Sequence, residues 1–426
     1  TKVPGDKSVS HRAMMLTSLA VGRSEVFGLL EGEDVLATVA AMRAMGATIN
    51  RLGEGHWEIY GVGVGGLTSP ENIIDMGNSG TSTRLLMGLM ATHDIQAVIT
   101  GDDSLRIRPM GRVINPLKEF GASFDARDGA YLPLTLKGTD IPVPIEYISP
   151  VASAQVKSAV ILAGLNTPGI TTLHEGVATR DHTERMLSAM GAEITVKDHS
   201  KGRTVTIKGE AELKPVTFEV PGDISSSAFP LVAASVVKGS DVLVKNVGLN
   251  PLRTGVIPML KAMGADVMVE NERMLGGEPV GDIRVKSAPL KAVTEIPVDP
   301  STMIDEFPVI FCAAAIAEGT SRFTGLEELR VKESDRLSVM AEGLKANGVV
   351  LEELEDGLII HGNGGKVPGG GTVKTHLDHR IAMSFSVLGL AAENPITIDD
   401  ATPIQTSFPS FIDLMNGLGA DLRVVS

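Results

Sequence analysis

A short phrase, Met-Gly-Ala in three of its copies, recurs six times along the chain at intervals of 70 to 84 residues. A helix-like segment precedes each glycine, and in five copies two strand-like runs joined by a polar turn follow it. Each glycine is therefore expected at the helix C′ position, where a positive φ is favoured. The six glycines are Gly46, Gly121, Gly191, Gly264, Gly348 and Gly419.

Upstream of each glycine the sequence predicts a heavily apolar helix, a strand, a charged loop and the helix that the glycine ends. The repeating unit is β-α-β-α-β-β, and the sixth copy ends in a single strand-like run, 421–426. This alternation indicates the α/β class, with helices packed inside and sheets outside. The residues alone do not decide between one continuous array of six repeats and two globules of three repeats each. The most hinge-like stretch is 220–222. The predicted apolar helices are His11–Ala20, Thr81–Met90, Ala154–Gly164, Ser226–Val237, Asp305–Ala317 and His379–Ala391.

The charge balance excludes several classes of function. The chain has 38 Lys and Arg residues against 52 Asp and Glu residues, a formal net charge of −14. Such an acidic chain is a poor candidate for wrapping nucleic acid or lying on an anionic membrane. We find no membrane-spanning run and no signal peptide, so we expect a cytoplasmic protein. The single cysteine, Cys312, lies in an apolar run, where an inert buried thiol is expected.

Cationic and hydroxyl side chains collect where helices are predicted to begin, and free N–H groups at these positions favour anions. Each cluster also fits a capped turn or a solvated helix face. His376, Asp378 and His379 resemble metal ligands, but caps explain such crowded residues better. The recurrence of the same residue types in register favours binding. The clusters are 6–12, 77–84, 106–108, 153–157, 180–182, 330–336 and 376–380.

So many cations indicate a ligand set with several negative charges, plausibly two phosphorylated molecules. Arginine matches phosphate or carboxylate in two-point contact, and lysine acts as a point charge. Asp305 and Glu333 lie among these cations. A carboxylate pair in a dry cationic pocket suits proton transfer.

Four motifs, taken in order, resemble the 5-enolpyruvylshikimate-3-phosphate synthase family, and the resemblance runs essentially end to end. The family fold has two domains, each with three β-α-β-α-β-β repeats, and an active site in the cleft between them. The resemblance implies one domain of 1–5 with 222–426 and another of 6–221. The motifs are Pro4-Gly5-Asp6-Lys7-Ser8, Gly77-Asn78-Ser79-Gly80-Thr81, Arg330-Val331-Lys332-Glu333-Ser334-Asp335-Arg336 and Asp378-His379-Arg380-Ile381-Ala382-Met383.

The family transfers the enolpyruvyl group of phosphoenolpyruvate to the 5-hydroxyl of shikimate 3-phosphate and releases phosphate. This transferase step belongs to the shikimate pathway to chorismate and the aromatic amino acids. It proceeds by addition through a tetrahedral intermediate, followed by elimination. The resemblance implies no metal and no organic cofactor. The implied partners are the two small substrates, without nucleic acid or membrane, and we expect a monomer.

The resemblance assigns three catalytic residues. Asp305 takes the proton of the 5-hydroxyl, and Glu333, helped by Lys7, protonates the methylene carbon and later removes a methyl proton. The residues implied for shikimate 3-phosphate are Lys7, Ser8, Arg12, Ser153, Ala154, Gln155, Arg180, Asp305 and Lys332. Those implied for phosphoenolpyruvate are Lys7, Asn78, Gly80, Arg108, Gln155, Arg336 and Arg380.

Two stretches depart from the commoner family pattern. Ser82-Thr83-Arg84 replaces the usual Ala-Met-Arg, and 405–409 lacks a Lys that reaches phosphoenolpyruvate in many members. Both departures resemble the divergent subgroup that includes glyphosate-tolerant enzymes. That tolerance is linked to Ala at the second glycine of the motif, whereas Gly80 is retained here. Glyphosate is therefore a candidate inhibitor whose effect the sequence leaves open.

Three alternative functions fit the sequence less well. The sister transferase acting on UDP-N-acetylglucosamine usually has a reactive Cys on a mobile loop, whereas Cys312 lies in an apolar helix-like run. A non-catalytic phosphometabolite-binding relative should have lost acid/base residues, yet Lys7, Asp305 and Glu333 are present. An RNA-end-processing enzyme on a related repeat fold conflicts with the acidic net charge.

Overall fold

The computed structural model describes residues 1–425. These residues divide into two compact units, which we treat separately. The N-unit comprises Lys7–Val220 together with Leu275–Glu278. The C-unit comprises Thr1–Asp6, Pro221–Met274 and the chain from Pro279 onward.

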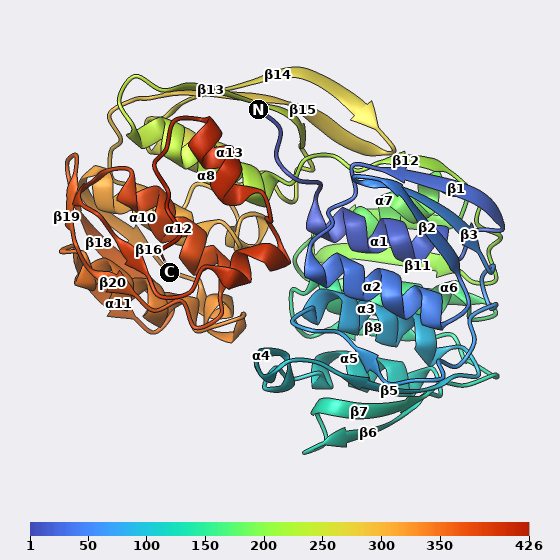
Figure 1. Ribbon diagram of the computed structural model, residues 1–426. Helices are drawn as coiled ribbons and strands as arrows, with labels where there is room; N and C mark the ends of the chain where they lie inside the picture. The colour runs from blue at the N-terminus through green and yellow to red at the C-terminus, as the bar shows by residue number, and fades with distance from the viewer. Residues whose placement is uncertain (426) are drawn as a thin grey trace. The chain divides into compact units, whose positions relative to one another are not determined.

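The N-unit holds three repeats, and most of their elements are labelled in Figure 1. The first repeat contains α1 (Lys7–Thr17), β1 (Gly22–Phe27), α2 (Glu33–Ala44), β2 (Thr48–Gly53) and β3 (His56–Gly61). The second contains β4 (Ile74–Asp75), α3 (Gly80–Ala91), β5 (Gln96–Thr100), α4 (Asp103–Arg106), α5 (Gly111–Glu119), β6 (Ser123–Arg127) and β7 (Tyr131–Lys137). The third contains β8 (Glu146–Ser149), α6 (Ala154–Leu165), β9 (Ile170–Glu175), α7 (His182–Ala189), β10 (Ile194–His199), β11 (Gly202–Lys208) and β12 (Thr217–Glu219).

Each repeat of the N-unit builds a four-stranded sheet, with orders β12-β1-β3-β2, β4-β5-β7-β6 and β10-β11-β9-β8. In the second and third sheets the leading strand, β4 or β8, pairs in parallel with the strand that follows the first helix. In the first sheet β12 takes this place beside β1, so the leading strand comes from the far end of the unit. The expectation that every repeat begins with its own strand is therefore wrong for the first repeat.

The interior of the N-unit is made by α1, α3 and α6, which are buried along most of their length. Figure 1 shows α1, α2 and α3 side by side, with β1 and β3 next to them. Helices α3 and α6 approach closely at Gly88, where a Cβ atom would lie 2.4 Å from the carbonyl oxygen of Ala159. The helices lie inside because their small and apolar side chains can pack on every face.

The C-unit also holds three repeats. The fourth repeat of the chain contains α8 (Ile224–Val236), β13 (Asp241–Gly248), α9 (Val256–Ala262), β14 (Asp266–Leu275) and β15 (Glu278–Lys286). The fifth contains the 3-10 turn η1 (Pro300–Thr302), α10 (Phe307–Ile316), β16 (Glu318–Phe323), η2 (Glu327–Val331), α11 (Arg336–Ala346), β17 (Val350–Leu354) and β18 (Gly357–Asn363). The sixth contains β19 (Val367–Gly369), β20 (Thr372–Val373), α12 (His379–Gly389), β21 (Ala392–Asn394), β22 (Thr397–Ile398), η3 (Thr402–Thr406) and α13 (Phe411–Gly417).

The sheets of the C-unit are smaller than those of the N-unit. Two have three strands, in the orders β13-β15-β14 and β16-β18-β17, and the sixth repeat has only the pairs β19-β21 and β20-β22. The leading strands of the fourth and fifth repeats are reduced to parallel bridges, Gly222 with Val247 and Lys291 with Glu318. The strand-like run predicted at 421–426 is wrong for 421–425, which pair with no other described strand, and Ser426 lies outside the described residues.

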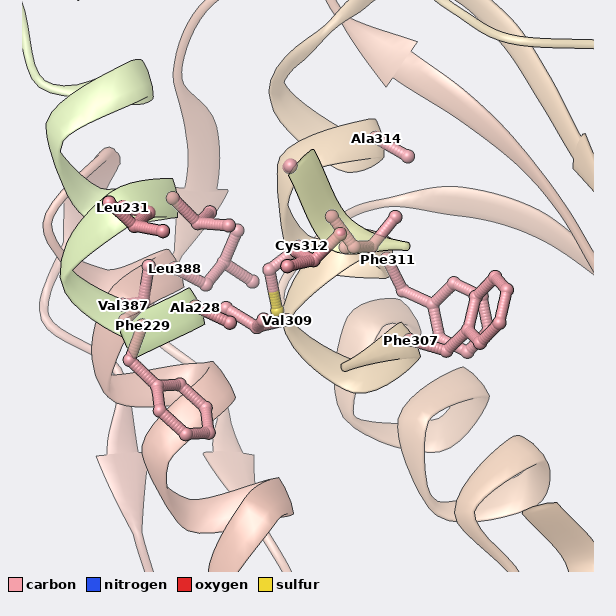
Figure 2. Close-up of a cluster of buried hydrophobic side chains, with 14 of the residues drawn as sticks. Ala228, Phe229, Leu231, Phe307, Val309, Phe311, Cys312, Ala314, Val387 and Leu388 are labelled. Atoms are coloured by element: carbon pink, nitrogen blue, oxygen red, sulfur yellow. The ribbon is translucent and has the colours of Figure 1, made fainter. Parts of the chain in front are cut away.

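The core of the C-unit is built by α8, α10 and α12, whose apolar side chains meet in one cluster. Figure 2 shows Cys312 of α10 among side chains that include Ala228, Val309 and Leu388. The thiol is fully buried, and this burial raises its pKa. Because a thiol held in the protonated form is a poor nucleophile, Cys312 acts as a core residue, as the sequence predicts.

Arg253 ties together two separate segments of the C-unit. The Asp6 backbone N–H donates to the Pro221 carbonyl at 2.7 Å, and the Asp223 N–H donates to the Pro4 carbonyl at 2.9 Å. The buried Arg253 guanidinium lies 3.4 Å from the carboxylates of both Asp6 and Asp223. Two segments of the C-unit that lie next to crossings to the N-unit are thus held by one cation.

The local predictions succeed at the repeat glycines but misplace several helix starts, including those of α1, α8 and α10. All six repeat glycines have positive φ, between 80° and 111°. Helix α1, however, begins at Lys7 rather than at His11. The polar residues of this first turn are retained because they bond inside the fold: Ser10 Oγ accepts from the Leu30 N–H, and His11 Nδ1 lies 2.7 Å from Thr38 Oγ1. The polar character of residues 7–10 therefore led to a predicted helix start that lies four residues too late.

No helix within residues 1–425 has the length and apolar character needed to cross a membrane.

Substituting Gly88 with Ala tests the close approach of α3 and α6. We expect Gly88→Ala to lower the free energy of unfolding by about 1–3 kcal/mol, because the added methyl group overpacks the interface. Gly417→Ala is the matched control, since Gly417 is also helical and a Cβ there meets no atom within 4 Å. Urea unfolding followed by circular dichroism measures both variants. Equal stability of the two variants would contradict the close approach.

Candidate active site

The predicted site residues fall into two groups, one on each unit. The N-unit carries Lys7, Ser8, Arg12, Asn78, Gly80, Arg108, Ser153, Ala154, Gln155 and Arg180. The C-unit carries Asp305, Lys332, Glu333, Arg336 and Arg380.

The loop before α3 binds the side chain of Arg108. Ser79 caps α3, and its side chain accepts from the Ser82 N–H. Asn78 Oδ1 accepts from Arg108 Nη2 at 2.7 Å, and the Asn78 amide donates to Asp102 Oδ2, also at 2.7 Å. Arg108 is almost fully buried, so its guanidinium is held beside the start of α3, next to Gly80. A cation and a helix N-terminus together form a site that suits a phosphate or a carboxylate.

Arg84 is a residue that the sequence analysis quoted but did not assign to the site. It lies one turn after Gly80 on α3, and its Nη1 donates to Gln155 Oε1 at 2.9 Å. Gln155 Nε2 in turn donates to Thr81 Oγ1 at 2.9 Å, which joins the first turns of α3 and α6. A Cβ on Gly80 would lie 2.9 Å from Arg84 Nη1 and 3.3 Å from Arg108 Nη1. Gly80 thus keeps two guanidinium groups close to the backbone.

Lys7 occupies the first turn of α1 and forms an ion pair with Asp34 of α2. Its Nζ atom lies 2.5 Å from Asp34 Oδ2, and the two side chains are 19% and 6% exposed. The carboxylate is the more deeply buried partner, so it orients the ammonium while leaving it accessible. No sequence pattern pointed to Asp34, which is 27 residues away in a charged helix start.

Arg12 is buried between three helices. Its Nε donates to Thr183 Oγ1 at 2.7 Å, its Nη2 to Ser158 Oγ at 2.8 Å, and its Nη1 to the Ser8 carbonyl at 2.9 Å. This cation therefore joins α1 to the first turns of α6 and α7. Its assignment to shikimate 3-phosphate remains a prediction.

The start of α6 and the loop before α7 carry the remaining predicted residues of the N-unit. Ser153 is the N-cap of α6, and its Oγ accepts from the Val156 N–H. Ser153, Ala154, Gln155 and Arg180 are all partly exposed. Arg180 follows Thr179, which is buried, so the loop is anchored just before the arginine.

Arg336 gathers three carboxylates in the C-unit. Its Nε donates to Asp378 Oδ2 at 2.8 Å and its Nη2 to Glu333 Oε2 at 2.7 Å, while its Nη1 lies 3.4 Å from Asp305 Oδ1. The guanidinium is 1% exposed. Burial alone would lower the pKa of Arg336, but the charges of Asp378, Glu333 and Asp305 outweigh it and raise the pKa. The two predicted proton-transfer carboxylates therefore share one permanently charged partner.

Asp378 is a fully buried member of this cluster that the predicted site omitted. It caps α12 by accepting from the Arg380 N–H at 2.9 Å, and its Oδ2 also accepts from Ser334 Oγ at 3.0 Å. His376 and Leu377 before it have φ of 50° and 59°, a region that such residues rarely adopt. The strained turn is held in place by the bonds of Asp378. Within residues 1–425 no cluster of three or more His, Cys, Asp or Glu side chains is arranged to hold a metal ion.

Arg380 and Lys332 complete the C-unit group. Arg380 Nη1 donates to the backbone carbonyl of Asp305 at 3.0 Å, which fixes the loop that carries this carboxylate. The sequence suggested that Asp305 lies in the first turn of a helix. Helix α10 begins at Phe307 instead, so Asp305 lies in the turn before it. Lys332 is partly exposed and has no ion-pair partner among the described residues. Arg380 and Arg336 thus both contact Asp305, the first at its backbone carbonyl and the second at its carboxylate.

Known proteins share the fold and much of the sequence of this chain. The model of the EPSP synthase (3-phosphoshikimate 1-carboxyvinyltransferase) family matches residues 1–415. A 3-phosphoshikimate 1-carboxyvinyltransferase of Sphingopyxis alaskensis is 58% identical over 98% of this chain and 95% of its own length. A 3-phosphoshikimate 1-carboxyvinyltransferase of Zymomonas mobilis is 59% identical over 99% of this chain and 94% of its own length. A structure of EPSP synthase from Acinetobacter baumannii has a TM-score of 0.89 and 47% identity, covering 100% of this chain and 96% of that one. The chain therefore belongs to the EPSP synthase family.

Proposed function

We propose that this chain transfers the enolpyruvyl group of phosphoenolpyruvate to the 5-hydroxyl of shikimate 3-phosphate and releases phosphate. The chain is a transferase by its family. The single observation that carries the chemistry is the pairing of Asp305 and Glu333 with separate nitrogens of Arg336. The two carboxylates are thereby oriented for two proton transfers. The cation between them attracts a phosphorylated substrate.

We assign the substrates as the resemblance implies. Lys7, Ser8, Arg12, Ser153, Ala154, Gln155, Arg180, Asp305 and Lys332 bind shikimate 3-phosphate in this proposal. Lys7, Asn78, Gly80, Arg108, Gln155, Arg336 and Arg380 bind phosphoenolpyruvate. Both sets draw on both units, so the proposed site lies in a cleft between a domain of 1–5 and 222–426 and a domain of 6–221. The observations in support are the local ones, above all the guanidinium of Arg108 beside the first turn of α3.

The proposed reaction has two steps. In the addition, the 5-hydroxyl oxygen bonds to C2 of phosphoenolpyruvate, its proton passes to Asp305, and C3 receives a proton from Glu333 with help from Lys7. In the elimination, Glu333 removes a proton from the new methyl group, the C2–phosphate oxygen bond breaks, and phosphate leaves. Arginine and lysine side chains stabilise the charge that develops on the leaving phosphate.

We further propose that the chain belongs to the divergent subgroup that includes glyphosate-tolerant enzymes, acts as a monomer and works in the cytoplasm. The supporting observations for the subgroup are Ser82-Thr83-Arg84 and the absence of Lys from 405–409. Arg84 is common to both patterns, and the replaced positions are Ser82 and Thr83; the Thr83 hydroxyl donates to the Ser79 carbonyl at 2.7 Å, a bond that Met could not make. Glyphosate is the candidate inhibitor, and Gly80 is the residue that bears on its effect.

Phosphate release tests the proposed function. The purified chain is incubated with phosphoenolpyruvate and either shikimate 3-phosphate or UDP-N-acetylglucosamine. We expect phosphate with the first acceptor only, in amounts equal to the enolpyruvyl product. Release with the nucleotide sugar alone would establish the sister activity, and no release with either acceptor would favour a non-catalytic relative.

Glu333→Gln tests the acid/base assignment. We expect kcat to fall by at least about 100-fold, because the amide can neither give nor take the proton at C3. Glu342→Gln is the control, since Glu342 lies exposed on the same α11 segment. Steady-state kinetics with both substrates measures the change. Turnover close to that of the unmodified chain would remove Glu333 from the mechanism.

Gly80→Ala tests the phosphoenolpyruvate site. The added Cβ displaces Arg84 and Arg108, so we expect the KM for phosphoenolpyruvate to rise by about tenfold, roughly 1.4 kcal/mol of binding free energy. The KM for shikimate 3-phosphate should change little, and glyphosate should inhibit the variant less than the parent. Gly111→Ala is the control, because a Cβ there meets only the Ala130 methyl group, at 3.6 Å. An unchanged KM for phosphoenolpyruvate would show that these guanidiniums do not bind it.

A further inference from the structure

Lys157 is a buried cation on α6 that the proposed mechanism does not use. It lies two residues after Gln155, and its side chain is 1% exposed. Its Nζ atom lies 3.1 Å from Glu175 Oε1 and 2.8 Å from Glu184 Oε1. It also donates to the backbone carbonyl of Thr179 at 2.8 Å. The ammonium thus connects α6 to β9, to α7 and to the loop between them.

Two carboxylates share this one ammonium in an almost water-free environment. Glu175 and Glu184 are both nearly fully buried. Burial raises the pKa of Glu184 above its usual range, although the charge of Lys157 opposes this shift. Because burying ions is costly, apolar side chains of similar volume would fill such a space at no loss of stability. The cluster of Lys157, Glu175 and Glu184 is therefore expected to have a role other than stability.

The cluster holds both backbone groups of Thr179. The Thr179 N–H donates to Glu175 Oε1 at 3.3 Å, and its hydroxyl donates to Glu175 Oε2 at 2.7 Å. The Thr179 carbonyl accepts from Lys157 at 2.8 Å. This carbonyl belongs to the peptide bond that leads to Arg180. The ammonium consequently sets the plane of the peptide from which the Arg180 side chain departs.

The neighbouring residue on α6 extends the same link. Ser158 Oγ accepts from Arg12 Nη2 at 2.8 Å and lies 2.8 Å from Thr183 Oγ1 on α7. Lys157 and Ser158 therefore hold the loop before α7 and the first turn of that helix against α6. Helix α6 begins with Ser153, Ala154 and Gln155, the other residues proposed for shikimate 3-phosphate.

We infer that Lys157 is a positioning residue for shikimate 3-phosphate, acting through the Thr179–Arg180 peptide. This inference rests on the proposed function, in which Arg180 binds that substrate. The Lys157 side chain is buried, and its bond to the Thr179 carbonyl links it to the orientation of Arg180. Loss of the ammonium should weaken the binding of shikimate 3-phosphate and leave phosphoenolpyruvate, assigned to other residues, largely unaffected.

A double-mutant cycle between Lys157 and Arg180 tests the inference. The variants are Lys157→Met, Arg180→Ala and their combination, and calorimetry measures the Kd of shikimate 3-phosphate for each. We expect Lys157→Met to raise this Kd by about tenfold in the parent and by less than about twofold in the Arg180→Ala background, because coupled residues are non-additive. The KM for phosphoenolpyruvate should change by less than about threefold. Lys208→Met is the control, since Lys208 pairs with Glu193 on the surface.

Four outcomes would overturn the inference. An unchanged Kd in Lys157→Met would remove Lys157 from substrate binding. An equal rise in Kd in both backgrounds, or a parallel rise in both KM values, would show a general structural role. Arg180→Ala with unchanged Kd would overturn the inference together with the assignment of Arg180. A parent chain that binds no shikimate 3-phosphate would instead overturn the proposed function itself.

Thr179→Val provides the same test if Lys157→Met does not fold. Valine has the shape of threonine, and the change removes only the hydroxyl donor to Glu175. We expect a rise in the Kd of shikimate 3-phosphate of about threefold, abolished in the Arg180→Ala background. A Kd for Thr179→Val equal to that of the parent would overturn the inference.

Discussion

Burial of one helix from each repeat is the constraint on which the rest of the structure depends. Helices such as α3 and α6 in the N-unit and α10 and α12 in the C-unit are enclosed along most of their length. An enclosed helix presents only its ends, and its first turn carries N–H groups without intrahelical partners. Polar and cationic residues therefore gather at several first turns, as Lys7, Thr81, Gln155 and Arg380 do. The repeat thus places candidate binding groups where α1, α3, α6 and α12 begin, whereas α10 begins with apolar residues.

The second constraint is the charge of the chain. A protein with a net charge of −14 binds anions only where cations are held locally against the overall field. Arg12 and Arg336 are each at least 97% buried, and protein oxygens hold each of them in one orientation. A side chain that is already fixed loses little conformational entropy when a ligand binds. Asp34 orients Lys7, and Asp378 orients Arg336. Carboxylates therefore lie beside these cations even though the expected ligands are negatively charged.

Patterns within a short stretch of sequence predicted more of the structure than relations between residues far apart in the chain did. The six glycines and the six apolar helices followed from short-range patterns, because a C′ glycine and an apolar run depend on their neighbours in the chain. Asp34 and Lys157 were missed because burial and pairing depend on tertiary contacts. Glu175 and Glu184 lie 18 and 27 residues from Lys157, and no spacing rule joins them. The signal available was a single Lys in the otherwise apolar 156–165 segment, which needs a buried partner.

The geometry of Arg336 explains why one cation can serve two proton transfers. Its Nη1 faces Asp305 and its Nη2 faces Glu333, so each carboxylate has its own nitrogen and its own direction. A lysine at this position would offer a single point charge that both carboxylates compete for. Asp378 binds the remaining Nε and stops the fork from rotating. In the proposed reaction Glu333 acts first as an acid and then as a base, and the buried guanidinium of Arg336 holds it in one place for both steps.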